Sequence, residues 1–219
     1  GAGPCAAALE IVQCAEALQA VLTMRREDAH VVAEPFYRRA GDALEDWLAK
    51  AAAADSKYGV VVGLENLDYV AVHLAADSSS ADRTALHQLA LRCADKCLEH
   101  TARYCDWMWR YEFLKVDTFY AKVLDASRNK TKPPSGNPNK ASLSGVEDGL
   151  NKVLKRLDKH FPPGSRSDPN LRTKLKRALL TYAKTTWARY DDLARSTFNV
   201  PIKPSTADLD AITAKLLAH

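Results

Sequence analysis

The sequence predicts an all-α fold, arranged as an elongated rod of stacked antiparallel helical bundles. Apolar residues recur at helical spacing along most of the chain, and a content of 47% hydrophobic and 26% charged residues is typical of a folded globular protein. No proline or glycine interrupts residues 81–126, so a single helix about 70 Å long is expected there. Such a helix exceeds the diameter of a compact domain of this size, which favours a rod.

The stretch SKYGVVVGLENLDYVAVHL, residues 56–74, is expected to be the helix around which the others pack. Its apolar residues cover most of a helical barrel, a pattern typical of an element buried on several sides. Its valines would also suit a strand, but no second strand of matching character exists in the sequence to pair with it. Asn66 is predicted to be a buried structural polar residue whose amide bonds to neighbouring backbone or a polar side chain. The alternative is a partner contact.

Further helices are predicted on both sides of this segment. They cover residues 4–25, 35–54, 81–126, 144–161 and 169–199, with a short terminal helix capped by Ser205 and Asp208. Within 81–126, the seam expected to face a neighbouring helix consists of Leu86, Ala90, Cys93, Cys97, His100, Tyr104, Trp107, Tyr111, Leu114, Thr118 and Ala121. A second face carries Trp109, Phe113, Val116 and Tyr120, for which core packing is favoured over base stacking.

Composition predicts three parts of the chain. Residues 1–126 are expected to form a helical bundle with a long central helix, and residues 127–142, rich in proline, are expected to form a flexible loop. Residues 143–219 are expected to form a C-terminal helical hairpin plus a short terminal helix of the same rod. The absence of an initial Met indicates an excised region of a longer protein, and charges within residues 6–22 argue against a signal peptide or membrane span.

Five cysteines are too few, and odd in number, for a secreted disulfide scaffold, so a reducing cytosol is expected. Cys93, Cys97 and His100 share one helical face, where a metal site is conceivable. Their spacing matches no zinc motif, and small buried thiols are common in cores, so no metal is predicted.

The sequence contains no glycine-rich phosphate loop, nucleophile elbow or disulfide-reductase motif. The acidic pairs Glu147-Asp148 and Asp191-Asp192 are expected to be solvated rather than catalytic. The chain is therefore not expected to be an enzyme, and neither a cofactor nor a small-molecule substrate is predicted.

The net charge of +4 conceals an asymmetry along the chain. Residues 1–121 hold 12 basic and 18 acidic residues, whereas residues 122–203 hold 18 basic and 7 acidic residues. An acidic partner or an anionic lipid surface is expected to bind the basic half, although a merely solubilising surface is the alternative. The candidate residues, which helical geometry places opposite the apolar faces, are Lys152, Lys155, Arg156, Lys159, Lys174, Arg177, Lys184 and Arg195.

Three stretches, taken in order, carry a resemblance to a known family. The first is residues 56–74, with Lys57-Tyr58, Glu65-Asn66 and Tyr69; the second is GVEDGLNKVLKRLDKHF, and the third is TTWARYDDLARSTFN. Together they resemble the C-terminal helical region of the exocyst subunit Sec-three, also named exocyst complex component one. The resemblance covers about residues 34–199. Gly63 is a departure from the family pattern, in which a basic residue often occupies this position.

The resemblance implies a stacked-bundle rod of the tethering-complex (CATCHR-like) type and a scaffold role in docking secretory vesicles at the plasma membrane. It implies other exocyst subunits as partners and a cytoplasmic location, peripheral at exocytic sites, with phosphoinositide membrane as a further expected partner. The alternatives are another helical scaffold, such as the exocyst subunit Exo-seventy, or a basic helical protein that binds nucleic acid without a specific sequence.

Overall fold

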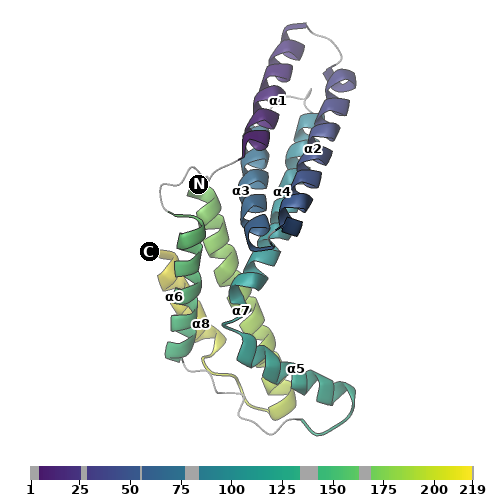
Figure 1. Cartoon of the computed structure of the whole chain (residues 1–219). Coiled ribbons are helices and arrows are strands. Elements are labelled where there is room, and N and C mark those ends of the chain that lie inside the picture. Colours follow the sequence, from purple (N-terminus) through teal and green to yellow (C-terminus); the bar gives the residue numbers. More distant parts are fainter. Residues whose placement is uncertain are drawn as a thin grey trace. The chain divides into compact units, whose positions relative to one another are not determined.

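The computed structural model describes residues 5–25, 29–54, 56–76, 84–133, 143–162 and 169–218. Within these residues the chain forms eight α-helices and no strand, which confirms the predicted all-α class (Figure 1). The helices are α1 (Ala6–Arg25), α2 (Ala29–Ala54), α3 (Ser56–Ala76), α4 (Thr84–Trp109), α5 (Leu114–Arg128), α6 (Leu143–His160), α7 (Pro169–Phe198) and α8 (Thr206–Ala218).

Packing divides the chain into two compact units. Unit 1 comprises residues 1–104 and 160–172, and unit 2 comprises residues 105–159 and 173–219. This division follows contacts in space, whereas the predicted parts 1–126, 127–142 and 143–219 follow composition and stay predictions. Residues 134–142 of the expected loop lie outside the described residues.

In unit 1, α1, α2 and α3 contact one another, and the part of α4 up to Tyr104 runs beside them (Figure 1). Segment 56–76 is a helix with buried residues around most of its circumference, as predicted. Helices α1, α2, α3 and α4 all contribute to one core, because each places apolar residues against its neighbours. The buried members of that core are Ala8, Val12, Ala15, Tyr37, Leu44, Leu67, Val70, Leu74, Leu89, Ala90 and Cys93.

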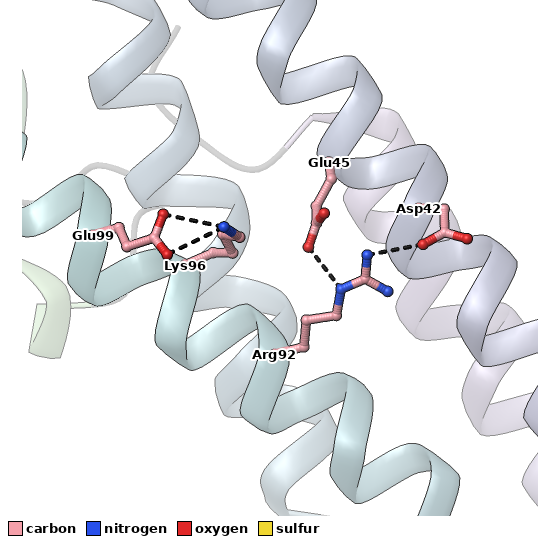
Figure 2. Close-up of polar contacts among 5 residues, drawn as sticks. All are labelled: Asp42, Glu45, Arg92, Lys96 and Glu99. Atoms are coloured by element: carbon pink, nitrogen blue, oxygen red, sulfur yellow. Dashed lines mark hydrogen bonds and ion pairs between the residues drawn. The ribbon is translucent and has the colours of Figure 1, made fainter.

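An ion-pair bridge joins α4 to α2 at the edge of this core. The guanidinium of Arg92 donates through Nε to Glu45 at 2.7 Å and through Nη2 to Asp42 at 2.8 Å (Figure 2). These hydrogen bonds raise the pKa of Arg92 above its ordinary value. One cation therefore fixes two acidic residues, which lie about one helical turn apart on α2.

Helix α2 begins at Ala29, six residues before the predicted start at Pro35, which lies inside the helix. The prediction of Pro35 in a first turn was therefore wrong. Proline cannot donate to the carbonyl four residues earlier, so the helix lacks one hydrogen bond at this point. Packing of the next turn offsets this loss: Tyr37 is buried, and its hydroxyl lies 3.5 Å from the carbonyl oxygen of Ala15 on α1.

The single helix predicted over residues 81–126 was also wrong. Helix α4 ends at Trp109, residues 110–113 form a bend, and α5 starts at Leu114. The bend buries Phe113 on Trp109, with ring centroids 4.9 Å apart, while it leaves Tyr111 69% exposed. Aromatic packing therefore overrides the local helical pattern, which contains no proline or glycine to mark the break.

The same bend changes which face of the second half is buried. Tyr120 and Val123 lie in the core, whereas the predicted seam residues Thr118 and Ala121 are exposed. The core of unit 2 thus uses the second predicted face, to which Trp109, Phe113 and Tyr120 belong. Phe113 lies 6.3 Å, between ring centroids, from both Trp187 and Tyr190 of α7.

Indole N–H groups connect the elements of unit 2. Trp109 donates through Nε1 to the carbonyl oxygen of Leu179 at 3.0 Å, which joins α4 to α7. Trp187 donates through Nε1 to the carbonyl oxygen of Pro204 at 2.8 Å, which holds the segment before α8. Buried indoles need such partners, since an unsatisfied N–H costs free energy in a core.

The predicted end of α7 and the predicted start of α8 are both confirmed. Helix α7 ends at Phe198, and Asn199 follows with φ 54°, a left-handed conformation that asparagine tolerates better than most residues. Ser205 and Asp208 form a reciprocal capping box before α8. The N–H of Ser205 donates to the carboxylate of Asp208 at 2.9 Å, and the N–H of Asp208 donates to the hydroxyl of Ser205 at 3.2 Å.

Gly63 permits the close approach of α3 to α4. A Cβ atom at this position would lie 2.5 Å from Nδ1 of His100, a distance at which the ring must shift. A basic side chain, as in the family that the segment resembles, would not fit this arrangement. At Gly149 of α6, by contrast, the nearest atom to an added Cβ would be Oε2 of Glu112 at 3.8 Å, an ordinary contact.

We expect Gly63→Ala to lower the free energy of unfolding and Gly149→Ala to raise it. Overpacking costs about 1–3 kcal/mol, whereas Gly to Ala inside a helix contributes about 0.5–1 kcal/mol where space allows. Urea unfolding followed by circular dichroism measures both changes. Equal stabilisation by the two substitutions would contradict the close packing of α3 on His100.

Candidate partner-binding surface

Helix α6 separates an apolar face from a basic one. Leu150, Val153 and Leu157 are buried, because they recur every three or four residues and face the core of unit 2. Lys152, Lys155 and Lys159 are exposed on the opposite side of the helix. Three of the four predicted cations of α6 thus lie on the solvent-facing side.

Arg156 is the exception, because its side chain is half-buried and paired with an acidic residue. Its guanidinium pairs with Glu112 at 2.5 Å, and the two side chains are only 31% and 23% exposed. Glu112 belongs to the bend between α4 and α5. Arg156 therefore holds that bend against α6, a role hidden in the sequence because the partners lie 44 residues apart.

A second cation of α6 is paired with an acidic residue of the same helix. Lys152 pairs with Asp148 one turn earlier at 2.6 Å, and this hydrogen bond raises the pKa of Lys152. Lys155 and Lys159 form no ion pair with any residue that the structure describes. Both ammonium groups therefore remain available to a partner.

The four predicted cations of α7 are all exposed, and Lys174, Lys184 and Arg195 each interact with other residues of the chain. Lys184 pairs with Asp210 of α8, and Arg195 pairs with Asp191 at 2.8 Å. Lys174 and Arg177 lie near the start of the helix. All eight candidates of the two helices belong to unit 2, which holds 19 basic and 11 acidic residues.

Asp191 is not the solvated residue that the sequence suggested. Its carboxylate is buried, accepts the backbone N–H of Ile202 at 2.7 Å and accepts Nε of Arg195 at 2.8 Å. It thereby anchors the chain after α7, and Arg195 neutralises its charge. Both partners place Asp191 in a structural role.

A further group of cations lies at the end of α5 and just after it, in unit 2. Arg128, Lys130 and Lys132 are all exposed, and the sequence interpretation had counted them within the loop rather than as a binding surface. In the sequence, these three cations alternate with single neutral residues, and this pattern could have identified them as a basic cluster.

Asn66 on α3 is 1% exposed, and its amide is hydrogen-bonded on both sides. Nδ2 donates to the carbonyl oxygen of Val62 at 2.7 Å, and Oδ1 accepts the backbone N–H of Cys5 at 2.7 Å. Cys5 immediately precedes α1, so this bond satisfies one of the N–H groups that a helix start leaves without an intrahelical partner. Asn66 thus acts as a cap supplied by a different helix.

We expect Asn66→Ala and Asn66→Leu to lower the free energy of unfolding by about 1–3 kcal/mol, because both leave buried backbone groups unpaired. Asn151→Ala on α6 is the control, since Asn151 is only half-buried. Urea unfolding gives the comparison. An unchanged stability for both Asn66 variants, with loss of partner capture, would instead identify Asn66 as a partner contact.

Cys93 and His100, two of the residues considered for a metal, are buried on α4, and Cys97 is half-buried. Burial raises the pKa of the Cys93 thiol to about 12, so the thiolate that binds metal is scarce at neutral pH. No group of His, Cys, Asp and Glu among the described residues could hold a metal ion. Cys93 belongs to the apolar core of unit 1, and Cys97 packs against that core.

The burial of His100 makes the stability of the fold depend on pH. Burial is the main cause that lowers the pKa of His100 below 6.5, and the positive charge of Arg103 is the second. Glu99 raises this pKa and Lys96 lowers it, both more weakly. Nδ1 of His100 has no hydrogen-bond partner in the described part of the chain. Below the unfolded-state pKa, the unfolded chain takes up the proton more readily than the folded one, so stability falls as pH falls.

We expect the free energy of unfolding to decrease as pH is lowered from 7 to 5.5, and His100→Gln to reduce that slope. His87→Gln, at an exposed position on the same helix, is the control and should leave the slope unchanged. Urea unfolding at several pH values measures the slopes. A slope that His100→Gln does not alter would exclude this residue as its source.

Comparison of the chain with protein-family models, curated proteins and solved structures gives no match. Among the described helices, none has the length and apolar character needed to cross a membrane. Function is therefore inferred from the surface chemistry of the helices and from the resemblance of three sequence stretches.

Proposed function

We propose that the chain is a non-enzymatic helical scaffold, and that the basic surface of unit 2 docks an acidic surface of a partner protein. The observation that carries this proposal is the row of exposed cations on α6, Lys152, Lys155 and Lys159, opposite a face already used by the core. Opposite charges on a partner would speed its association and select its orientation.

An acidic protein fits this surface better than a membrane does. Helices that lie on membranes insert an apolar face into the lipid, whereas the apolar face of α6 is buried in its own unit. Among the residues of unit 2 that the structure describes, the exposed large hydrophobics are Tyr111, Val200 and Leu217, all of them outside α6 and α7. Anionic phosphoinositide membrane is the other occupant that a test must separate.

The proposed biological setting is the exocyst, with this chain as the C-terminal helical region of the Sec-three subunit. Support comes from the resemblance of residues 56–74, 145–161 and 185–199, which lie in or at the ends of helices α3, α6 and α7 in the same order. On this proposal the partners are other exocyst subunits, the chain is part of a stacked-bundle rod, and it acts at plasma-membrane sites of vesicle docking.

The test reverses the charges of Lys152, Lys155 and Lys159 to Glu and leaves Arg156 in place, because Arg156 holds the bend. Melting should change little, since exposed ion pairs contribute about 0–1 kcal/mol each. Capture of purified exocyst subunits should weaken by about tenfold or more at low salt. Wild-type binding should fall as salt increases.

The matched control reverses the exposed residues Arg38, Arg39 and Lys50 of α2 in unit 1, which changes the net charge equally. Loss with the α6 variant alone supports the proposal. Equal loss with both variants, or with neither, contradicts a specific docking surface. If the α6 variant loses only its binding to phosphoinositide vesicles, the membrane is the occupant. Strong, salt-sensitive binding of the wild-type chain to arbitrary duplex DNA would favour the nucleic-acid alternative.

A further inference from the structure

The outward face of α4 in unit 1 carries a leucine ridge, defined here as Leu91, Ala94, Leu98 and Ala102. Leu91 is 51% exposed and Leu98 is 69% exposed. A spacing of seven residues places the two leucines within about 20° of each other around the helix. Cys93 and His100, which are buried, lie on the opposite face.

A single exposed leucine on a protein surface needs no explanation, but this pair repeats at heptad spacing, with Ala94 between the two leucines and Ala102 one turn after the second. Ala94 and Ala102 have side chains short enough to let another helix approach closely. Leucines seven residues apart are the pattern with which one helix packs lengthwise against another. The ridge therefore has the form of one half of a helix-helix interface.

One edge of the ridge is acidic. Asp95 is exposed beside the two leucines and forms no ion pair within the described residues. Glu99, one turn later, is held on the same helix by Lys96, whose ammonium lies 3.1 Å from both carboxylate oxygens (Figure 2). The other edge carries His87 and Thr101 and has no fixed charge.

A second copy of this chain is a poor occupant of the ridge. If two copies paired in antiparallel register, each Leu91 would face Leu98 of the other copy, and the symmetry axis would pass between positions 94 and 95. The two Asp95 carboxylates would then meet near the axis, and like charges repel. A helix with Lys or Arg at that place would instead complement Asp95.

We propose that the leucine ridge docks an amphipathic helix of a different protein, with apolar residues at heptad spacing and basic residues beside them. This inference does not depend on the basic surface of α6, because the two surfaces lie in different units and require partners of opposite charge. Either one can fail without affecting the other.

The test uses the full chain and two labelled synthetic helical peptides of about three heptads, each with Leu at positions a and d. One peptide carries Lys at e and g, and its twin carries Glu there, so that neither pairs with itself. Fluorescence anisotropy measures binding. The Lys peptide should bind at least about tenfold more tightly than the Glu peptide.

Substitutions then identify the binding face. Leu98→Ser should weaken binding of the Lys peptide about tenfold, because it removes a buried leucine contact. Leu217→Ser, which alters an exposed leucine of α8, should have no effect. Asp95→Lys should reverse the preference between the two peptides. Circular dichroism of each variant shows whether the fold is retained, as expected for exposed positions.

Three results would overturn the proposal. The first is no binding of either peptide, and the second is binding of the Lys peptide that neither Leu98→Ser nor Asp95→Lys alters. The third is a dimer of the wild-type chain, seen by light scattering, that Leu98→Ser converts to a monomer. That last result would assign the ridge to a second copy of this chain.

Discussion

The burial of α3 is the constraint on which unit 1 depends. A helix with buried residues on most of its faces can hold polar groups only where the surrounding helices supply partners. Asn66 meets this condition by bonding to Val62 within α3 and to the backbone before α1. Gly63 meets a steric condition, because it leaves room for the ring of His100. Asn66 and Gly63 therefore help to position the neighbours of α3, the first through the start of α1 and the second through the close approach of α4.

Features encoded by neighbouring residues could be predicted from the sequence. The helical character of α3 follows from its dense apolar pattern, the end of α7 from Asn199 and the following prolines, and the start of α8 from Ser205 and Asp208. Each depends on residues within about one helical turn of one another. The basic face of α6 could be predicted for the same reason, since three- and four-residue spacing sets both of its faces.

Features that depend on distant residues could not be predicted. The bend after Trp109 follows from packing of Phe113 with Trp187 and Tyr190, more than 70 residues later in the chain. The partner of Arg156 lies in that bend, and the partner of Lys184 lies in α8. Helical periodicity gives the face on which a cation lies, but it does not identify the acid that the fold brings beside it.

The exposure of each ion pair decides which cations a partner can use. Lys152 and Asp148 are 58% and 62% exposed, so water already weakens their attraction and an incoming carboxylate can replace Asp148 at little cost. Asp191 is only 10% exposed, and removing Arg195 from it would leave a buried charge without its cation. Arg156 and Glu112 are intermediate, at 31% and 23% exposed. Lys152 can therefore exchange its acid, Lys155 and Lys159 have no acid to release among the described residues, and Arg156 and Arg195 are retained by the fold.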